Sequence, residues 1–437
     1  MTNTRKVLES QEENLTRKQV KVLYVCPFAH YPGHPPWAAL NEPVALKEAG
    51  ADVKLLTFCG IIDNFKAQVP ATVVMPAKYG LAHRFFWFVR RWTPTRWVLM
   101  LLETASTIAK AIDIKHREGF DVIYLRDGEP FLFMSHLLSL RFKGLNWIVS
   151  LTAANIYLPK MPKFGIRSFP LMTYILVSRF VINSPVWRLL YRISLRRNNF
   201  RFVTQNRAAE REYNEYLGGV FGNRVQYLPI GAGNMNHDIQ VNKREARRTL
   251  GLPQRKPIFL SFGAPHSGKD LDVIFRALQG MPDVHLVHAG KQAFSLGSNL
   301  ALLAKRYGTE NRTVVKDHYI PEEEKPYYFY AADAVILSYT RQFLSTSSLL
   351  WEACLFGTPI IASDNGQLKE LMEAFQPGLL FTAQDADSLK EAIIHFINLK
   401  PEEIEVLKSN CRRFANEFSI ERWAQKCLEI CDGLLIK

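Results

Sequence analysis

The sequence predicts an α/β protein built from two doubly wound domains. Three observations support this fold class. Short apolar runs typical of buried strands alternate with helix-like segments along the chain, and the alternation pauses once, near residues 233–255. The length of 437 residues suits two domains of about 200 residues each. A hydrophobic fraction of 48% also excludes a mainly disordered chain.

The N-terminal half begins with a βαβ pattern. Residues 1–19 are polar and are expected to form a flexible leader. A strand at 21–28, a Gly/Pro loop, a helix ending at Gly50 and a second strand at 51–58 follow, so a right-handed parallel sheet is expected. We assign residues 20–235 to this N-terminal domain, with further strands at 121–127, 145–152, 200–206 and 224–233.

The second alternation defines a second α/β domain over residues 255–415. An amphipathic helix is expected to close the chain over residues 419–437. Two such domains would place ligands in a cleft at the carboxyl ends of both sheets. The strands of this domain are expected at 256–265, 284–290, 313–321, 334–339, 360–363 and 379–382.

The six cysteines form neither a CxxC pair nor a Cys/His cluster, so we interpret them as structural thiols of a reducing cytoplasm. No secretory signal opens the chain. No His/Asp/Glu cluster has the spacing of metal ligands, so we expect no required metal and no cofactor.

Basic residues are concentrated in the first half of the chain. The net charge is +14, and residues 1–240 hold 31 Lys and Arg against 17 Asp and Glu, whereas residues 241–437 hold 24 of each. Between Pro130 and Ala209 there are twelve basic residues and no acidic one. This asymmetry indicates a surface that meets an anionic partner.

Two segments within the basic half combine aromatic and cationic residues, at 81–102 and 164–197. Their charge-free runs are shorter than the roughly 20 apolar residues that a membrane span needs. We expect both to lie on an anionic membrane surface; the alternatives are an insert packed on the core with solvated arginines, or nucleic-acid binding, for which no known motif is present. The membrane-facing candidates are Arg84, Trp87, Arg90, Arg91, Trp92, Arg179, Trp187 and Arg188.

The segment from Ser338 to Leu371 carries the clearest functional signal. It predicts a strand, a polar loop, a helix capped by Ser347 or Ser348, a stop at Gly357 and another strand. A helix that begins at the carboxyl end of a parallel strand is suited to bind phosphate. Glu352 would lie about one turn into this helix, where its carboxylate can accept hydrogen bonds from a hydroxyl pair. The segment therefore predicts a phosphorylated, hydroxyl-rich ligand.

These segments together resemble the two-domain GT-B glycosyltransferases, specifically the group 1 class (family 4), which uses nucleotide sugars. The resemblance covers roughly residues 20–437 and is carried by FLSFGAPHSGKDLDVIFRAL, VHLVHAGKQ, DHYIPEEEKPYYFYAADAVILSY, LLWEACLFGTPIIASDNGQLKELM and FSIERWAQKCLEI. It implies two Rossmann-like domains facing a cleft, with the donor in the C-terminal domain and the acceptor in the N-terminal domain. It also implies that the last helix crosses back onto the N-terminal domain.

The resemblance also implies roles for individual residues. Lys269 matches the lysine that holds the donor diphosphate, and Glu352 matches the glutamate that binds the ribose hydroxyls. The remaining donor-binding candidates are Gly33 in the loop over the phosphates, Gly263 and His266 near Lys269, Tyr319 and Ile320 at the base, and the backbone amides of Ser347, Ser348 and Leu349.

The sequence departs from the family pattern at three places. Leu344 replaces the first glutamate of the donor motif, Ala264 replaces an arginine, and residues 152–155 lack the family's histidine. These departures leave open a retaining or an inverting reaction. They also leave open a degenerate subunit that binds donor and partners an active transferase.

Two further residues are candidates for catalysis. Asp127 follows an expected strand and could be the general base for an acceptor hydroxyl; the alternative is a helix cap or a salt bridge to Arg126. His30 lies in the first loop and could contact donor or acceptor. We expect a hexosyltransferase on the inner face of the cell membrane, acting on a lipid-linked or glycan acceptor in surface polysaccharide or glycolipid synthesis.

Overall fold

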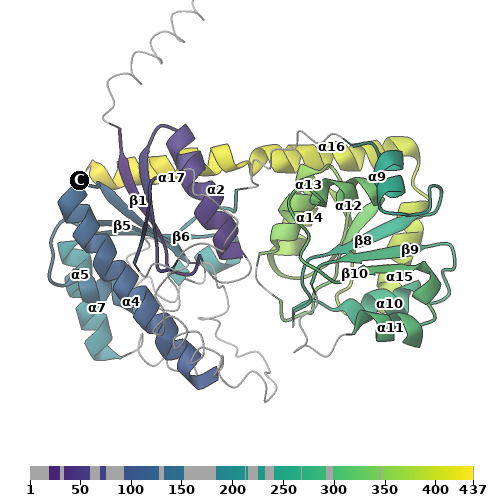
Figure 1. Cartoon of the computed structure of the whole chain (residues 1–437), viewed down its shortest axis with the longest axis horizontal. Helices are drawn as coiled ribbons and strands as arrows, with labels where there is room; N and C mark the ends of the chain where they lie inside the picture. The colour runs from purple at the N-terminus through teal and green to yellow at the C-terminus, as the bar shows by residue number, and fades with distance from the viewer. Residues whose placement is uncertain are drawn as a thin grey trace, which may run out of the picture.

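The protein consists of two lobes, each a parallel sheet with helices on both faces (Figure 1). The first lobe is formed by the N-terminal half of the chain, and the final helix returns to it (Figure 1). The computed structural model describes residues 19–29, 34–59, 69–74, 93–126, 132–151, 184–211, 213–214, 225–231, 241–266, 268–291, 299–343 and 346–436.

The first sheet has seven strands in the order β3-β2-β1-β4-β5-β6-β7, and every pair is parallel. The chain fills one side of β1 first and then crosses to β4 on the other side, which makes β1 and β4 the topological switch point. The short edge strand β3 was not predicted from the sequence. The strands are β1 Lys21–Cys26, β2 Asp52–Thr57, β3 Ala71–Val73, β4 Val122–Leu125, β5 Asn146–Leu151, β6 Asn199–Thr204 and β7 Val225–Tyr227.

Four helices of this lobe are α2 His34–Glu48, α4 Thr93–Glu118, α5 Leu132–Ser139 and α7 Pro185–Arg197. The sequence predicted a loop where α2 begins, which is wrong. Its first turn contains two prolines, and a proline there lacks only an N–H that would have no intrahelical partner anyway.

The second sheet has six parallel strands in the order β10-β9-β8-β11-β12-β13. Several of its strands end earlier than the sequence predicted. The strand expected to reach Pro321, for example, ends at Lys316. The strands are β8 Ile258–Phe262, β9 His285–Ala289, β10 Thr313–Lys316, β11 Ala334–Leu337, β12 Ile360–Ser363 and β13 Gly378–Phe381.

Helices cover both faces of the second sheet, and two apolar cores lie between them and the strands. One core packs α10, α11 and α15 against the sheet, and the other packs α9, α12, α13, α14 and α16. The helices are α9 Lys243–Thr249, α10 Leu271–Leu278, α11 Leu300–Arg306, α12 Lys325–Ala331, α13 Ser348–Leu355, α14 Gly366–Phe375, α15 Ala386–Ile397 and α16 Pro401–Glu417, with a 3₁₀ turn at Glu310–Arg312.

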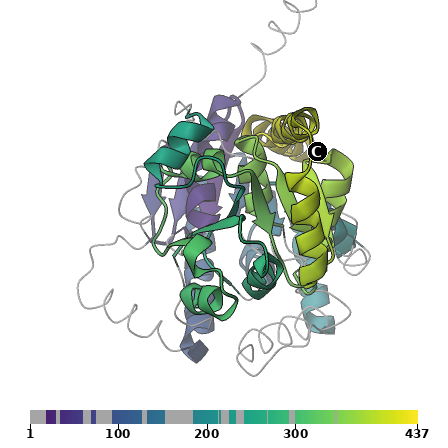
Figure 2. The same ribbon diagram turned by 90° about the vertical axis from the view of Figure 1, so that its right-hand side faces the viewer.

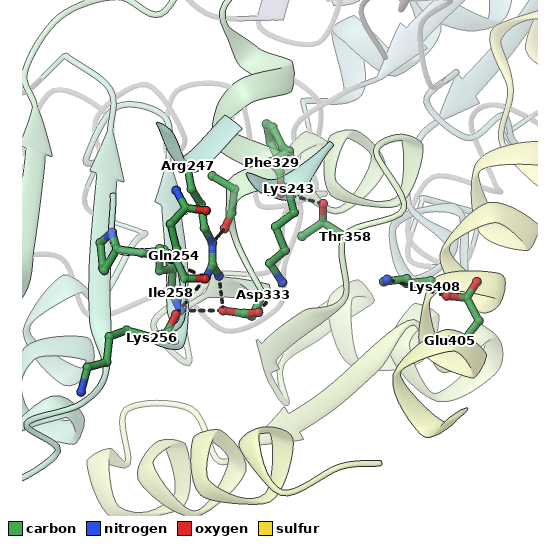
Figure 3. Close-up of polar contacts among 12 residues, drawn as sticks. Lys243, Arg247, Gln254, Lys256, Ile258, Phe329, Asp333, Thr358, Glu405 and Lys408 are labelled. Carbon is green, nitrogen blue, oxygen red and sulfur yellow. Dashed lines mark hydrogen bonds and ion pairs between the residues drawn. The ribbon is translucent and has the colours of Figure 1, made fainter. Parts of the chain in front are cut away.

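A buried arginine ties α9 to the amino end of the second sheet (Figure 3). Arg247 donates to the Asp333 carboxylate at 2.8 Å and to the carbonyl oxygens of Ala331 and Gln254 at 2.9 and 2.8 Å. Asp333 also accepts from the backbone N–H of Ile258 at 2.7 Å and is paired with Lys243. The Arg247 guanidinium and the Asp333 carboxylate find these hydrogen-bond partners within the second lobe, so we interpret the cluster as structural.

The last helix, α17 Ile420–Leu435, crosses from the second lobe to the first (Figures 1 and 2). Its buried face, including Trp423, Cys427 and Leu434, shares one core with β1 and α2. Close approach is possible because Gly231 has no side chain: a Cβ there would lie 2.8 Å from the Ile420 Cα atom. The chain thus connects its lobes twice, through the segment after β7 and through α17.

All six cysteines are buried. Among the described residues, no helix has both the length and the apolar character needed to cross a membrane.

Candidate functional site

The loops that follow β8 and β11 are joined at the carboxyl edge of the second sheet. Lys269 forms a backbone bridge with Tyr339. The N–H of Asp270 donates to the Ser338 carbonyl at 3.0 Å, and the N–H of Thr340 donates to the Gly268 carbonyl at 2.9 Å. The two loops that carry the donor candidates therefore form one surface.

The Lys269 side chain lies across the glycine turn that ends β8. Its ammonium Nζ donates to the carbonyl oxygen of Phe262 at 2.6 Å. Gly263 has φ +80°, and a Cβ at this position would lie 3.3 Å from Nζ. A glycine is needed here for both the backbone conformation and the close approach of the lysine.

Burial lowers the pKa of Lys269 to about 8, although the nearby Glu352 carboxylate opposes this shift. Burial and the Lys269 charge lower the pKa of His266 to about 4, and the same two causes lower the pKa of His288 to about 4. Both imidazoles are therefore neutral near pH 7. His288 pairs with the Ser261 hydroxyl at 3.1 Å beneath the loop.

Helix α13 has Ser347, one of the two predicted capping serines, at its N-cap position, but the serine side chain does not cap the helix. The Ser347 hydroxyl instead lies 2.7 Å from the Tyr339 hydroxyl, and the Tyr339 ring stacks on Phe343 with centroids 4.1 Å apart. The first N–H groups of an α-helix have no intrahelical acceptor. The amides at the start of α13, including those of Ser348 and Leu349, are therefore suited to bind an anion.

Glu352 lies in α13, and its carboxylate is paired with a residue that the sequence analysis did not single out. Lys325 Nζ lies 3.2 Å from Glu352 Oε1 and 2.8 Å from Glu322 Oε1. The sequence analysis predicted no helix here, and the structure shows that Lys325 is the first residue of α12 Lys325–Ala331, where the helix dipole disfavours a cation.

The two residues expected at the base have different environments. Tyr319 is 64% exposed, whereas Ile320 is 4% exposed and belongs to the core of the second lobe. Tyr319 can therefore present its ring to a ligand, while Ile320 supports the loop from below.

The donor loop also contacts the first lobe. The Gln205 carbonyl, at the end of β6, accepts from Gln367 Nε2 at 2.9 Å and from Thr346 Oγ1 at 3.3 Å. With its amide oriented toward the guanidinium, Gln205 also accepts from Arg126 at 2.6 and 2.8 Å. The sequence analysis missed these residues, because a contact to a carbonyl in another domain leaves no local pattern.

Arg126 follows β4 at the switch point of the first sheet and is almost fully buried. Its guanidinium lies 3.4 Å from the Glu42 carboxylate, which also accepts from the Tyr24 hydroxyl at 2.5 Å. Arg126 additionally donates to the Ser150 hydroxyl at 3.0 Å. A buried polar network thus surrounds Arg126, the residue that precedes Asp127 in the sequence.

A groove of about 1290 Å³ separates the lobes beside α14, α16 and α17. Its walls include Arg207, whose guanidinium lies 4.4 Å from the centre of the Tyr227 ring, and Arg413. The donor candidates that the structure describes do not line this groove. It is therefore a second opening, distinct from the surface that holds Lys269 and Glu352.

Several predicted site residues lie outside the described residues. They are His30, Gly33, Arg84, Trp87, Arg90, Arg91, Trp92, Asp127, Arg179 and Leu344, and the side chain of Trp187. Arg188 lies on the exposed face of α7. Within the described part of the chain, no group of three or more His, Cys, Asp or Glu side chains is arranged to hold a metal ion.

The site thus combines a buried ammonium, a helix N-terminus and a carboxylate, at the carboxyl edge of one sheet. The ammonium and the amides suit a phosphate group, and the carboxylate suits hydroxyl donors.

Part of the chain is similar in sequence to known glycosyltransferases. Residues 242–414 match the family model described as "Glycosyl transferases group 1". A D-inositol 3-phosphate glycosyltransferase of Mycobacterium avium (strain 104) is 30% identical over 159 residues, which are 35% of this chain and 36% of that relative. The aligned part therefore spans about a third of the length of that curated relative.

Two solved structures share the whole architecture. A sucrose-phosphate synthase from Thermosynechococcus elongatus aligns with a TM-score of 0.66 at 17% identity, covering 96% of this chain and 100% of the other. Anabaena HepE in complex with UDP and glucose aligns with a TM-score of 0.65 at 16% identity, covering 95% and 100%. The chain therefore has the GT-B fold that its sequence predicted, and its C-terminal domain is similar in sequence to group 1 glycosyl transferases over residues 242–414.

Proposed function

We propose that this protein is a glycosyltransferase that moves a sugar from a nucleotide diphosphate sugar to a hydroxyl group of a lipid-linked or glycan acceptor. The setting that fits this acceptor is surface polysaccharide or glycolipid synthesis. The donor binds the second lobe and the acceptor binds the first lobe, at the carboxyl edge of each sheet.

One observation carries the donor part of the proposal: Lys269, the N-terminus of α13 and Glu352 are joined on one surface. Lys269 is bridged to Tyr339, Tyr339 contacts Ser347, and Ser347 begins the helix that carries Glu352. This arrangement matches a diphosphate followed by a ribose diol. The UDP complex of the structurally similar Anabaena protein supports the same ligand class.

Transfer requires negative charge to be stabilised on the departing nucleoside diphosphate. The Lys269 ammonium supplies a positive charge, but it now donates to the neutral carbonyl of Phe262. Donor binding would exchange this carbonyl for a phosphate oxygen, which is the stronger acceptor. The α13 amides add a weaker, fixed contribution because they are already oriented.

Binding of nucleoside diphosphates and their sugars, followed by calorimetry, tests this proposal. Because a hydrogen bond to a charged group contributes about 1.5–3 kcal/mol, Lys269→Ala should weaken binding by about 10- to 100-fold. Lys256→Ala is the matched control, since Lys256 pairs with Asp283 on the surface. Absence of binding by any nucleotide of the panel would overturn the proposal.

The acceptor part of the proposal is supported by the outer face of α7. Val186, Leu189 and Ile193 are 65%, 58% and 38% exposed and follow helical spacing. Arg188 and Arg192, with Arg196, form an exposed basic row beside them, and the opposite face packs through Tyr191. Apolar and basic rows side by side suit an anionic membrane surface, where a lipid-linked acceptor would be presented.

A second candidate function is a degenerate subunit that binds donor and partners an active transferase. Leu344 in place of the first glutamate of the motif favours it. Release of nucleotide from a bound donor separates the two, because a degenerate subunit would bind the donor without consuming it. The anomeric configuration of any product then decides between a retaining and an inverting reaction with Asp127 as the base.

A further inference from the structure

Lys325 occupies an unfavourable position for a cation. It is the first residue of α12, where the helix dipole is positive, and its side chain is only 10% exposed. Its neighbours Tyr328 and Phe329 belong to the apolar core of the second lobe. An apolar side chain would meet these local conditions better than an ammonium group.

Two carboxylates account for the presence of this cation. Burial alone would lower the pKa of Lys325, but Glu352 and Glu322 outweigh it and raise that pKa. The contacts are 3.2 Å to Glu352 Oε1 and 2.8 Å to Glu322 Oε1. Lys325 is therefore charged throughout the physiological range and holds Glu352 in one orientation.

This pairing leaves donors and acceptors for a ligand. An ammonium has three N–H donors, and the two contacts use two of them. Among the described residues, Glu352 Oε2 has no hydrogen-bond partner, and the Glu352 side chain is 25% exposed. Tyr319 is exposed close to the same charges, at the place expected for the base.

The chemistry of a vicinal diol matches these groups. Each hydroxyl of a ribose both donates and accepts, whereas a carboxylate only accepts and an ammonium only donates. We propose that Lys325 is a specificity-determining residue, which orients Glu352 and together with it selects ribose over 2′-deoxyribose in the nucleotide of the donor. This inference rests on the proposed function, because it assigns Glu352 to the ribose.

The test compares UDP, ADP and GDP with their 2′-deoxy forms by calorimetry, on the full chain. Wild-type protein should bind the ribose form at least about 10-fold more tightly. Lys325→Met should lose most of this preference, because affinity for the ribose form falls while affinity for the deoxy form changes little. Lys325→Arg retains the cation and should retain part of the preference, and Lys256→Met is the matched control.

Removal of Lys325 leaves two carboxylates without their cation, which can destabilise the fold. The double variant Lys325→Met with Glu322→Gln removes one of these two negative charges, and thermal unfolding identifies which variant is folded. The inference is overturned if wild-type protein does not discriminate the two sugars, or if a folded Lys325→Met variant discriminates as well as wild type. Nucleotide binding that is lost in Lys269→Ala but unchanged in Lys325→Met would leave the proposed function intact and reject this inference alone.

Discussion

Lys269 lies in an environment that disfavours its charge in the free protein. Burial favours its neutral form, and the Glu352 carboxylate opposes this shift. His266 and His288 are both neutral near pH 7 because their pKa values lie near 4. A bound diphosphate would supply the missing negative charge.

We predict that nucleoside diphosphate affinity falls as the pH rises from about 7 to about 9, because Lys269 with a pKa of about 8 loses its proton over this range. The stability of the free protein should change in the opposite direction. The folded-state pKa of Lys269 is below the unfolded value of 10.5, so the unfolded chain binds more protons between these values and this group favours folding as the pH rises.

Calorimetric affinities and urea unfolding at matched pH values check both trends. Lys269→Arg keeps its charge and should flatten the affinity curve. An affinity that is constant from pH 7 to 9 in the wild-type protein would contradict the role of the Lys269 ammonium.

At the scale of elements, the second sheet depends on close backbone contact between β12 and β13. Gly378 starts β13 opposite Ile360, and a Cβ at Gly378 would lie 1.8 Å from the Ile360 carbonyl oxygen. That atom belongs to the backbone of a buried strand and cannot move without disturbing the sheet. A glycine is therefore needed at position 378 because the Ile360 backbone leaves no room for a side chain, and not because of the glycine's own backbone conformation.

Gly378→Ala should lower the free energy of unfolding by about 2–4 kcal/mol, because the added methyl group forces the strands apart. Gly433→Ala is the same chemical change in an exposed turn of α17, where nothing lies within 4 Å of the added atom. There the better helix propensity of alanine should raise the free energy of unfolding by about 0.5–1 kcal/mol. Equal effects of the two variants in urea unfolding would refute this explanation.

At the scale of the whole molecule, the two lobes differ in charge but are joined by the last helix. The basic excess lies in the first half of the sequence, with none in residues 241–437. Helix α17 nevertheless belongs to the core of the first lobe, where Trp423 packs edge-on to Tyr124 at 6.0 Å. A membrane surface that attracts one lobe would therefore hold the other through α17.

The protein should bind phosphatidylcholine vesicles that contain phosphatidylserine, and binding should weaken as salt rises from about 0.05 to about 0.5 M. Changing Arg188, Arg192 and Arg196 to Gln should weaken it by about 100-fold, at roughly 1 kcal/mol for each charge. The control is a triple variant of the second lobe in which Lys256, Lys408 and Arg412 are changed to Gln. It loses the same amount of positive charge, and its vesicle binding should change little. Vesicle sedimentation measures all of these, and equal losses in the two triple variants would show that α7 is not the contact surface.

The predicted fold class is confirmed, and most strands lie where the apolar runs predicted them. The edge strand β3 has only three residues, none of them fully buried, so it left no clear pattern. The predicted helix began later than α2 does, because the segment with two prolines in the first turn of α2 was interpreted as a loop. Strand ends were overextended because an apolar run continues into the packed loop that follows, as at Ile320.

The sequence by itself predicted the start of α13 and the position of Glu352 about one turn into it, because the signals for a helix start are local. Lys269 was added by the resemblance to a known family. Only the tertiary structure decided how these residues are held. Lys325 and Glu352 are 27 positions apart, and Gln205 and Gln367 are 162 apart. Such contacts depend on how distant elements pack against each other. They could not be predicted because the hydrophobic periodicity of one segment does not indicate which other segment will pack on it.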